Sequence, residues 1–209
     1  MKLYPIISII FGLLFTFSVS TYGNDAPENE KTDSSHPKQS LTLKEAAALA
    51  HKEAQKWNKD AKLYIGLSVD KDESQTGLDG KRKYWNIQFG IPGKRDWYLV
   101  TIQNGKVGET AHVPDELDAM SESYFISNVE DIQYDTPELL TKAQKLAEIY
   151  PGDIFAKGFN FGFTKDPHKN IPLVLVIGWD KSRKNMIYLS FHAKTGKLEN
   201  RLVREQYRN

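Results

Sequence analysis

Residues 84–105, YWNIQFGIPGKRDWYLVTIQNG, decide the fold class of this chain. Apolar and polar side chains alternate over 85–91, and they alternate again over 98–102. An alternation with a period of two is typical of a strand with one buried face. The pairs Pro92-Gly93 and Asn104-Gly105 are turn-forming dipeptides that end the two segments. The stretch therefore predicts neighbouring antiparallel strands, each ended by a turn.

A helix and one further strand are predicted upstream. Thr42 and Glu45 have the spacing of a capping box, in which the hydroxyl accepts the Glu45 amide and the carboxylate reaches back to the cap. From there to Asn58, a suitable end, apolar residues recur at the spacing of one helical face. Residues 63–69 then alternate as a strand. The apolar positions of the predicted helix are Leu43, Ala46, Ala47, Ala50, Ala54 and Trp57.

The same order of elements repeats in the second half of the chain. Thr136 is suited to the N-cap of a helix and Pro137 to its first position. Segments 159–163, 173–179 and 189–193 then alternate as strands. The apolar positions of the two helices coincide at an offset of 96 residues, which places Leu43 on Leu139. Those of the last predicted strands coincide at an offset of 91, which places Tyr98 on Leu189. The predicted face of the second helix is Leu139, Ala143, Leu146, Ala147 and Tyr150.

These repeats predict an α+β protein built from two tandem α-β-β-β units, each with one helix packed on an antiparallel sheet. The first unit is expected over 40–112 and the second over 128–209, which includes a basic C-terminal tail. An acidic connector, 113–127, joins them. It is either a solvated linker or a surface for a basic partner or calcium, and the basic tail is a candidate partner within the chain.

The N-terminal residues predict export. Residues 6–19 are strongly apolar, a length that suits a signal peptide better than a membrane span. We predict a signal peptide over 1–23 and a disordered leader over 24–39, which holds no periodic apolar residues. An uncleaved anchor is the alternative. The expected location is exported, either periplasmic or secreted.

Composition excludes several partners and chemistries. The chain has no cysteine, which excludes thiol catalysis, iron–sulfur clusters and anchoring through a lipidated cysteine. Without Lys2, which belongs to the signal segment, 27 basic side chains face 27 acidic ones. This balance argues against nucleic acid and against an anionic membrane as the main partner, and no stable membrane insertion is expected once the signal peptide is cleaved.

Parts of the sequence resemble the PepSY domain. The residues that carry the resemblance are an Ala-rich helix over 45–50, the strand start Tyr84-Trp85-Asn86-Ile87, and endings at 102–107 and 191–198 that contain Asn-Gly-Lys and Thr-Gly-Lys. His192 stands where that family usually has Asp. The resemblance implies a cystatin-like topology, one helix on a curved antiparallel sheet, and a role in binding or restraining peptidases. It implies no catalytic residues.

No catalytic, metal or cofactor motif is recognised. The five histidines form no His-Glu-x-x-His or other close pair, and no Gly-x-Ser-x-Gly elbow occurs. We therefore predict a non-enzymatic protein that binds a protein or peptide, with a secreted or envelope peptidase as one candidate, and that needs no cofactor. A small-ligand protein with a pocket between helix and sheet is the alternative. A hydrolase that uses His112 or His192 with scattered acids is the third hypothesis.

Four residues are the candidate binding residues. Trp97 and Tyr98 are successive in a strand, so they face opposite sides of the sheet. Either one of them is exposed, where aromatic side chains enrich binding surfaces, or the two units pack sheet to sheet and bury both. Asp79 and Lys81 lie in the polar loop 71–83. We expect recognition of the partner through an edge strand or a hairpin loop, because an antiparallel sheet leaves edges that can accept another strand, and this loop is then a first candidate.

Overall fold

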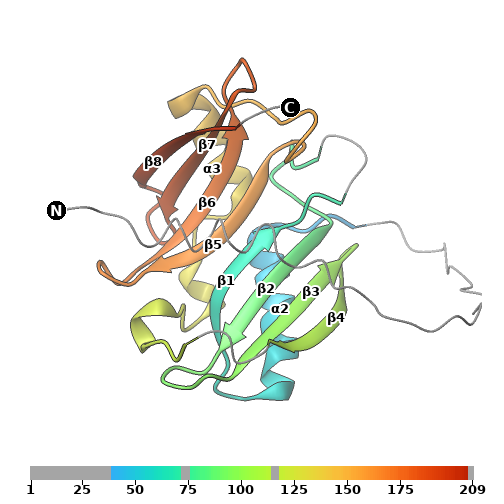
Figure 1. The fold of residues 1–209 in the computed structure, drawn as a ribbon, viewed down its shortest axis with the longest axis vertical. Helices are drawn as coiled ribbons and strands as arrows, with labels where there is room; N and C mark the ends of the chain where they lie inside the picture. Colours follow the sequence, from blue (N-terminus) through green and yellow to red (C-terminus); the bar gives the residue numbers. More distant parts are fainter. Residues whose placement is uncertain (1–38, 72–75, 114–117, 207–209) are drawn as a thin grey trace, which may run out of the picture. The chain divides into compact units, whose positions relative to one another are not determined.

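In the computed structural model of this chain, eight antiparallel strands form one continuous sheet (Figure 1). The structure describes residues 39–71, 76–113 and 118–206. The predicted signal peptide, all of the predicted leader except Gln39, and part of the acidic connector lie outside the described residues. The strands are β1 (Lys62–Ser68), β2 (Tyr84–Gly90), β3 (Trp97–Gln103), β4 (Lys106–Val113), β5 (Asn160–Asp166), β6 (Ile171–Trp179), β7 (Asn185–His192) and β8 (Leu198–Glu205).

The sheet corrects the predicted strand count. All six predicted strands are present. Each helix, however, is followed by four strands rather than three, and the prediction missed the fourth strands, β4 and β8. The strand order is β4-β3-β2-β1-β5-β6-β7-β8, so the first strands of the two halves pair at the centre. Edge strands bury neither face completely, and the charged or small residues of β4 and β8 leave little alternation to detect.

Helix α2 (Leu43–Trp57) follows the prediction closely. The Thr42 hydroxyl accepts the Glu45 amide at 3.2 Å, and the Glu45 carboxylate accepts the Thr42 amide at 2.8 Å, which confirms the capping box. Asn58 is the C-cap. The alanine face is fully buried, which lets the helix approach the sheet closely. Its buried residues are Leu43, Ala46, Ala47, Ala50 and Ala54.

Helix α3 (Thr136–Ala147) differs from the prediction at both ends. Its N-cap is Asp135 rather than Thr136, because the Asp135 carboxylate accepts the Thr136 amide at 2.7 Å. Leu146 was expected on the buried face but is 62% exposed in the last turn, whereas Leu140 is buried. Two short 3₁₀ helices, η1 (Glu122–Tyr124) and η2 (Val129–Asp131), lie in the segment before α3.

Both helices lie on the same face of the sheet, behind it in the view of Figure 1. One hydrophobic core therefore runs under both halves and includes the alternate strand residues that face the helices. The large aromatic members of this core lie on β2, on β5 and the residue before it, and on β7, and they are almost fully buried. They are Trp85, Phe89, Phe159, Phe161, Phe163 and Phe191.

The central seam between the halves is short. β1 and β5 share only two paired positions, Gly66 with Phe163 and Leu67 with Gly162. A Cβ on Gly66 would lie 2.3 Å from the Phe163 ring, and one on Gly162 would lie 2.7 Å from the Gly66 carbonyl oxygen. The seam therefore depends on the absence of a side chain at both glycines.

Candidate functional site

The structure separates the four predicted binding residues. Trp97 and Tyr98 begin β3 and pair with the last residues of β2, whereas Asp79 and Lys81 precede the first residue of β2. The two pairs therefore lie at opposite ends of β2 and do not form one site. Their surroundings also differ, so each pair is described by itself.

Trp97 is 1% exposed and does not lie on the surface. Its ring packs against Tyr64, with centroids 4.9 Å apart, and against Phe125, with centroids 5.8 Å apart. Phe125 follows η1, so the segment that joins the two halves covers this end of the sheet. Burial, rather than exposure, is therefore the outcome for Trp97, and it comes from the connector rather than from packing of one sheet on another.

Tyr98 lies on the opposite face in a half-exposed aromatic cluster. Its ring stacks on Trp57 at the end of α2, with centroids 4.8 Å apart and an interplanar angle of 12°. The His112 ring of β4 meets Tyr98 edge-on at 5.4 Å and Trp57 at 5.9 Å. Tyr98 and Trp57 are half-buried and His112 is exposed. We call these three residues the aromatic cluster.

The described part of the loop before β2, residues 76–83, is held through its backbone at Thr76 and Gly80, whereas Asp79 and Lys81 contact each other. Asp79 is exposed, and its carboxylate accepts the Lys81 amide at 3.0 Å within the loop. The Phe159 amide donates to the Thr76 carbonyl at 2.9 Å, and the Thr136 hydroxyl donates to the Gly80 carbonyl at 2.6 Å. The loop is therefore fixed between α3 and the segment that leads into β5.

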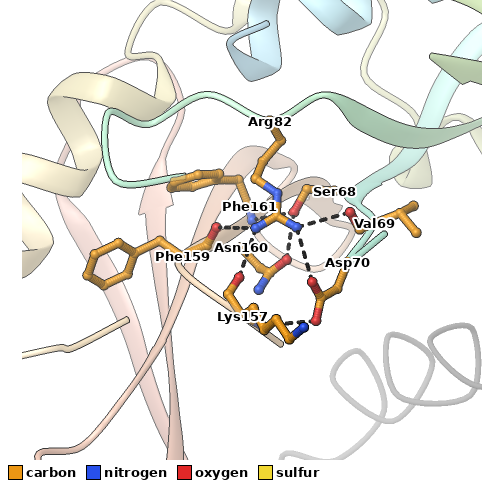
Figure 2. A network of polar contacts seen from close by, with 8 residues as sticks. All are labelled: Ser68, Val69, Asp70, Arg82, Lys157, Phe159, Asn160 and Phe161. Atoms are coloured by element: carbon orange, nitrogen blue, oxygen red, sulfur yellow. Dashed lines mark hydrogen bonds and ion pairs between the residues drawn. The ribbon is translucent and has the colours of Figure 1, made fainter. Parts of the chain in front are cut away.

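Arg82 is the residue that sequence reasoning missed. Its side chain is 0% exposed at the junction of the two halves, where Figure 2 shows it surrounded by carbonyl oxygens. The guanidinium donates to the carbonyls of Lys157 at 2.9 Å, Phe159 at 3.2 Å and Val69 at 3.0 Å. Asp70 lies 3.8 Å from it and supplies a carboxylate. An arginine in a polar loop gives no sequence signal for such burial.

The Arg82 network fixes a second loop, residues 151–158. Besides the bond from Arg82 to the Lys157 carbonyl, the Lys157 amide donates to the Asp70 carboxylate at 2.9 Å (Figure 2). Gly152 and Gly158 close the stem with reciprocal backbone bonds of 2.8 and 2.9 Å. The Arg183 guanidinium donates to the Pro151 carbonyl at 2.9 Å. Both ends of the loop are therefore anchored.

The tip of this second loop presents apolar side chains to solvent. Ile154 is 73% exposed and Phe155 is 46% exposed. Leu78, in the neighbouring loop, is 55% exposed. The Phe155 ring also meets Trp179 edge-on, with centroids 6.4 Å apart. Exposed apolar side chains on a loop with an anchored stem are typical of contact surfaces. We call Leu78, Asp79, Lys81, Ile154 and Phe155 the loop surface.

Histidines and acids were the candidate groups for a metal site or a scattered hydrolase site. In the part of the chain that the structure describes, no three or more His, Asp or Glu side chains gather in a way that could hold a metal ion. His112 belongs to the aromatic cluster, and the His192 Nδ1 accepts the Lys194 amide at 3.1 Å. Acids in and just after the connector form ion pairs instead. Asp118 pairs with Arg95 at 2.7 Å, and Asp131, which ends η2, pairs with Lys194 at 2.7 Å.

Among the described helices, none is both long and apolar enough to cross a bilayer. The space between α2 and the sheet is filled by side chains, since Ala47, Ala50, Ile87, Phe89 and Val100 are each 0% exposed. Both observations concern residues 39–71, 76–113 and 118–206.

Comparison with known proteins supports the fold. No protein-family model matches the chain, and no curated protein matches its sequence significantly. A crystal structure of a "putative lipoprotein" from Clostridium difficile 630 superposes with a TM-score of 0.51 at 15% sequence identity. The match covers 78% of this chain and 99% of that one. At this identity the similarity shows that the two proteins share an α+β fold.

Proposed function

We propose that this chain is an exported, non-enzymatic binding protein that recognises another protein through its loop surface. The observation that carries this proposal is the exposed Ile154-Phe155 pair on a loop anchored at both ends. A contact surface that is already ordered loses little conformational entropy on binding. Exposed apolar side chains such as these two are the usual anchors of such contacts, and polar residues, for which Asp79 and Lys81 are the candidates, usually form the rim.

Export is supported by the apolar segment 6–19 and by the polar stretch that follows it. The fold neighbour, described as a "putative lipoprotein" of Clostridium difficile 630, is in keeping with an envelope location. The proposal covers both an envelope location and release into the medium, and the capture experiment below samples both.

We further propose that each half is a PepSY-like unit and that its partner is a peptidase. The support is the packing of one helix on each half of a continuous antiparallel sheet, together with the sequence motifs of both halves. In this arrangement the cystatin-like unit carries a fourth strand and shares its sheet with the other unit.

The test is affinity capture with a matched pair of variants. The chain without residues 1–23 is immobilised and exposed to envelope and culture fluid of its source, and bound proteins are identified by mass spectrometry. Ile154→Asp with Phe155→Asp should abolish capture of a stoichiometric partner. The control variant Leu146→Gln replaces a 62% exposed leucine of α3 and should still capture the partner.

The outcome is decided by the difference between the two variants. A partner lost only in the loop variant supports the proposal, and a purified complex then shows whether the partner's peptidase activity falls. Equal capture by the wild-type protein and the loop variant would exclude the loop surface. Thermal midpoints of all three proteins show that each is folded.

A further inference from the structure

Among the described strands, β4 and β8 form the two edges of the sheet, and each is paired on one side only. The direction of the β4 backbone groups follows from the hydrogen bonds between β2 and β3. The Ile91 amide donates to the Asp96 carbonyl at 3.3 Å, and the Asn104 amide donates to the Lys83 carbonyl at 2.9 Å. Because bonded and non-bonded pairs alternate along an antiparallel ladder, Tyr98 of β3 bonds toward β2, and its neighbours bond toward β4.

The β3–β4 register then identifies the open groups of β4. Trp97 pairs with Val113 and Leu99 pairs with Ala111, so these two residues of β4 bond inward. Thr110 and His112 occupy the alternate positions of β4, between and beside Ala111 and Val113. Their backbone N–H and C=O groups therefore point away from the sheet, and both residues are exposed.

The side chains of the same two residues face the helix side of the sheet. His112 pairs with Tyr98 and Thr110 pairs with Val100, and directly paired residues share a face. The outward hydrogen-bonding groups and the aromatic cluster of Trp57, Tyr98 and His112 thus adjoin each other. A strand added antiparallel to β4 would place every second side chain beside this cluster.

The two edges of the sheet differ in their protection. Residues 110–113 carry no charged side chain, and the bulge that disrupts β4 pairing lies before them, between the positions of Val107 and Thr110. β8 has the sequence LENRLVRE, with four charged residues along its length. Charges on an edge strand disfavour addition of another strand, so β4 is the more receptive edge.

We propose that the β4 edge at Thr110–Val113 is a second binding site, which accepts an extended, uncharged polypeptide segment of another protein by antiparallel strand addition. Apolar side chains of that segment lie beside the aromatic cluster, and its backbone bonds to Thr110 and His112. The regular edge is only four residues long, which suits a linear segment rather than the large surface that a stable dimer buries. The site is independent of the loop surface.

The probe is the labelled peptide acetyl-Ser-Val-Thr-Phe-Thr-Val-Ser-amide, whose apolar residues alternate. Two analogues test the geometry. N-methylation of the Val and Phe amides removes the donors that face β4 when the apolar side chains lie beside the cluster, whereas N-methylation of the Thr amides removes donors on the far side. Fluorescence anisotropy should show at least about tenfold weaker binding for the first analogue only.

Matched variants test the protein side. Thr110→Pro removes one outward donor without removing a bond to β3, and Pro is tolerated at such edge positions. It should weaken binding about tenfold, as should Trp57→Ala, whereas Val203→Pro on β8 should leave binding unchanged. The loop variant with Asp at Ile154 and Phe155 should bind the peptide normally, which separates this site from the proposed function.

Three results would overturn the proposal. They are no measurable peptide binding by the folded wild-type protein, equal binding of both N-methylated peptides, and concentration-dependent dimerisation in sedimentation velocity that Thr110→Pro abolishes. The third would assign the edge to a second copy of this chain. The peptide analogues keep the test decisive if Thr110→Pro does not fold.

Discussion

The Asp135 carboxylate caps both α2 and α3, the two α-helices that the structure describes. Its Oδ1 atom accepts the Thr136 amide of α3 at 2.7 Å and the Lys44 amide of α2 at 3.1 Å. The hydroxyl of Thr136, which is fully buried, also accepts the Leu43 amide at 3.2 Å. Two helix N-termini, each with unpaired amides and a partial positive charge, are thus satisfied by neighbouring residues of one segment.

Asp135→Ala should therefore cost more than loss of an ordinary cap. A single N-cap contributes about 1 kcal/mol, and this carboxylate serves two helices, so we expect a loss of about 2 kcal/mol in urea denaturation. Asn128→Ala removes the exposed cap of η2 and should cost less. Asp135→Asn keeps an acceptor oxygen and should recover part of the loss. Equal costs for the two alanine variants would show that the shared cap adds nothing.

Arg82→Met should destabilise the junction strongly. The substitution preserves most of the side-chain volume but leaves the carbonyls of Val69, Lys157 and Phe159 without their donor. We expect a loss of about 2 to 3 kcal/mol, since a buried polar group that loses its partner costs about 1 to 3 kcal/mol and only the Phe159 carbonyl is fully buried. Arg95→Met is the control, because Arg95 pairs with Asp118 on the surface and should contribute at most about 1 kcal/mol. Urea denaturation measures both.

Gly162→Ala should loosen the central seam. Its Cβ would lie 2.6 Å from Leu67 Cδ2 and 2.7 Å from the Gly66 carbonyl oxygen, which cannot move without disturbing the β1–β5 pairing. We expect a loss of about 1 to 3 kcal/mol and faster hydrogen exchange in β1 and β5. Gly93→Ala is the comparison: it meets nothing within 4 Å, so its cost comes only from a φ of +75°. Unchanged exchange at the seam in Gly162→Ala would contradict this account.

Two buried tyrosines should make stability fall at high pH. Burial, reinforced by Tyr124, raises the pKa of Tyr64 to about 12. Burial also raises the pKa of Tyr188 to about 12, against an opposing effect of Arg204. An unfolded tyrosine ionises near pH 10, so the unfolded state releases these protons first. The stability contribution is present below pH 10 and is lost as the pH rises toward 12.

The measurement is the urea midpoint as a function of pH, together with absorbance titration of phenolate. The double variant Tyr64→Phe with Tyr188→Phe should show a shallower decline of stability between pH 10 and 12 and lose two late-titrating groups. Tyr98→Phe, at a half-buried tyrosine, is the control. A double variant with the wild-type slope would show that these phenols ionise normally in the folded protein.

Local sequence patterns predicted most helices and strands, but they missed the edge strands and misplaced one helix cap. The capping box at Thr42 and the alternation around Trp85 depend on residues close in sequence, and both were predicted correctly. The fourth strand of each half was missed, because an edge strand such as Leu198–Glu205 need not alternate. The N-cap of α3 was misplaced by one residue, since both Asp135 and Thr136 are good caps and only the geometry distinguishes them.

That the four candidate residues bind a partner stays a prediction. Tyr98 lies in an aromatic cluster whose other members come from α2 and β4, and these neighbours could not be named in advance. Trp97 was expected to be either exposed or buried by the other sheet, and Phe125 of the connector covers it instead. The Ile154-Phe155 pair has no periodic context, so its exposure could not be read from the sequence.

The sequence by itself determined the α+β class and, among the elements that the structure describes, both α-helices and six of the eight strands, because capping and alternation are short-range effects of side-chain size and polarity. Only the tertiary structure decided that the two halves share one sheet, that Gly66 and Gly162 meet at its centre, and that Arg82 is buried where the two halves meet. These features depend on which backbone segments approach one another across 75 to 97 residues, and a local pattern carries no information about that choice.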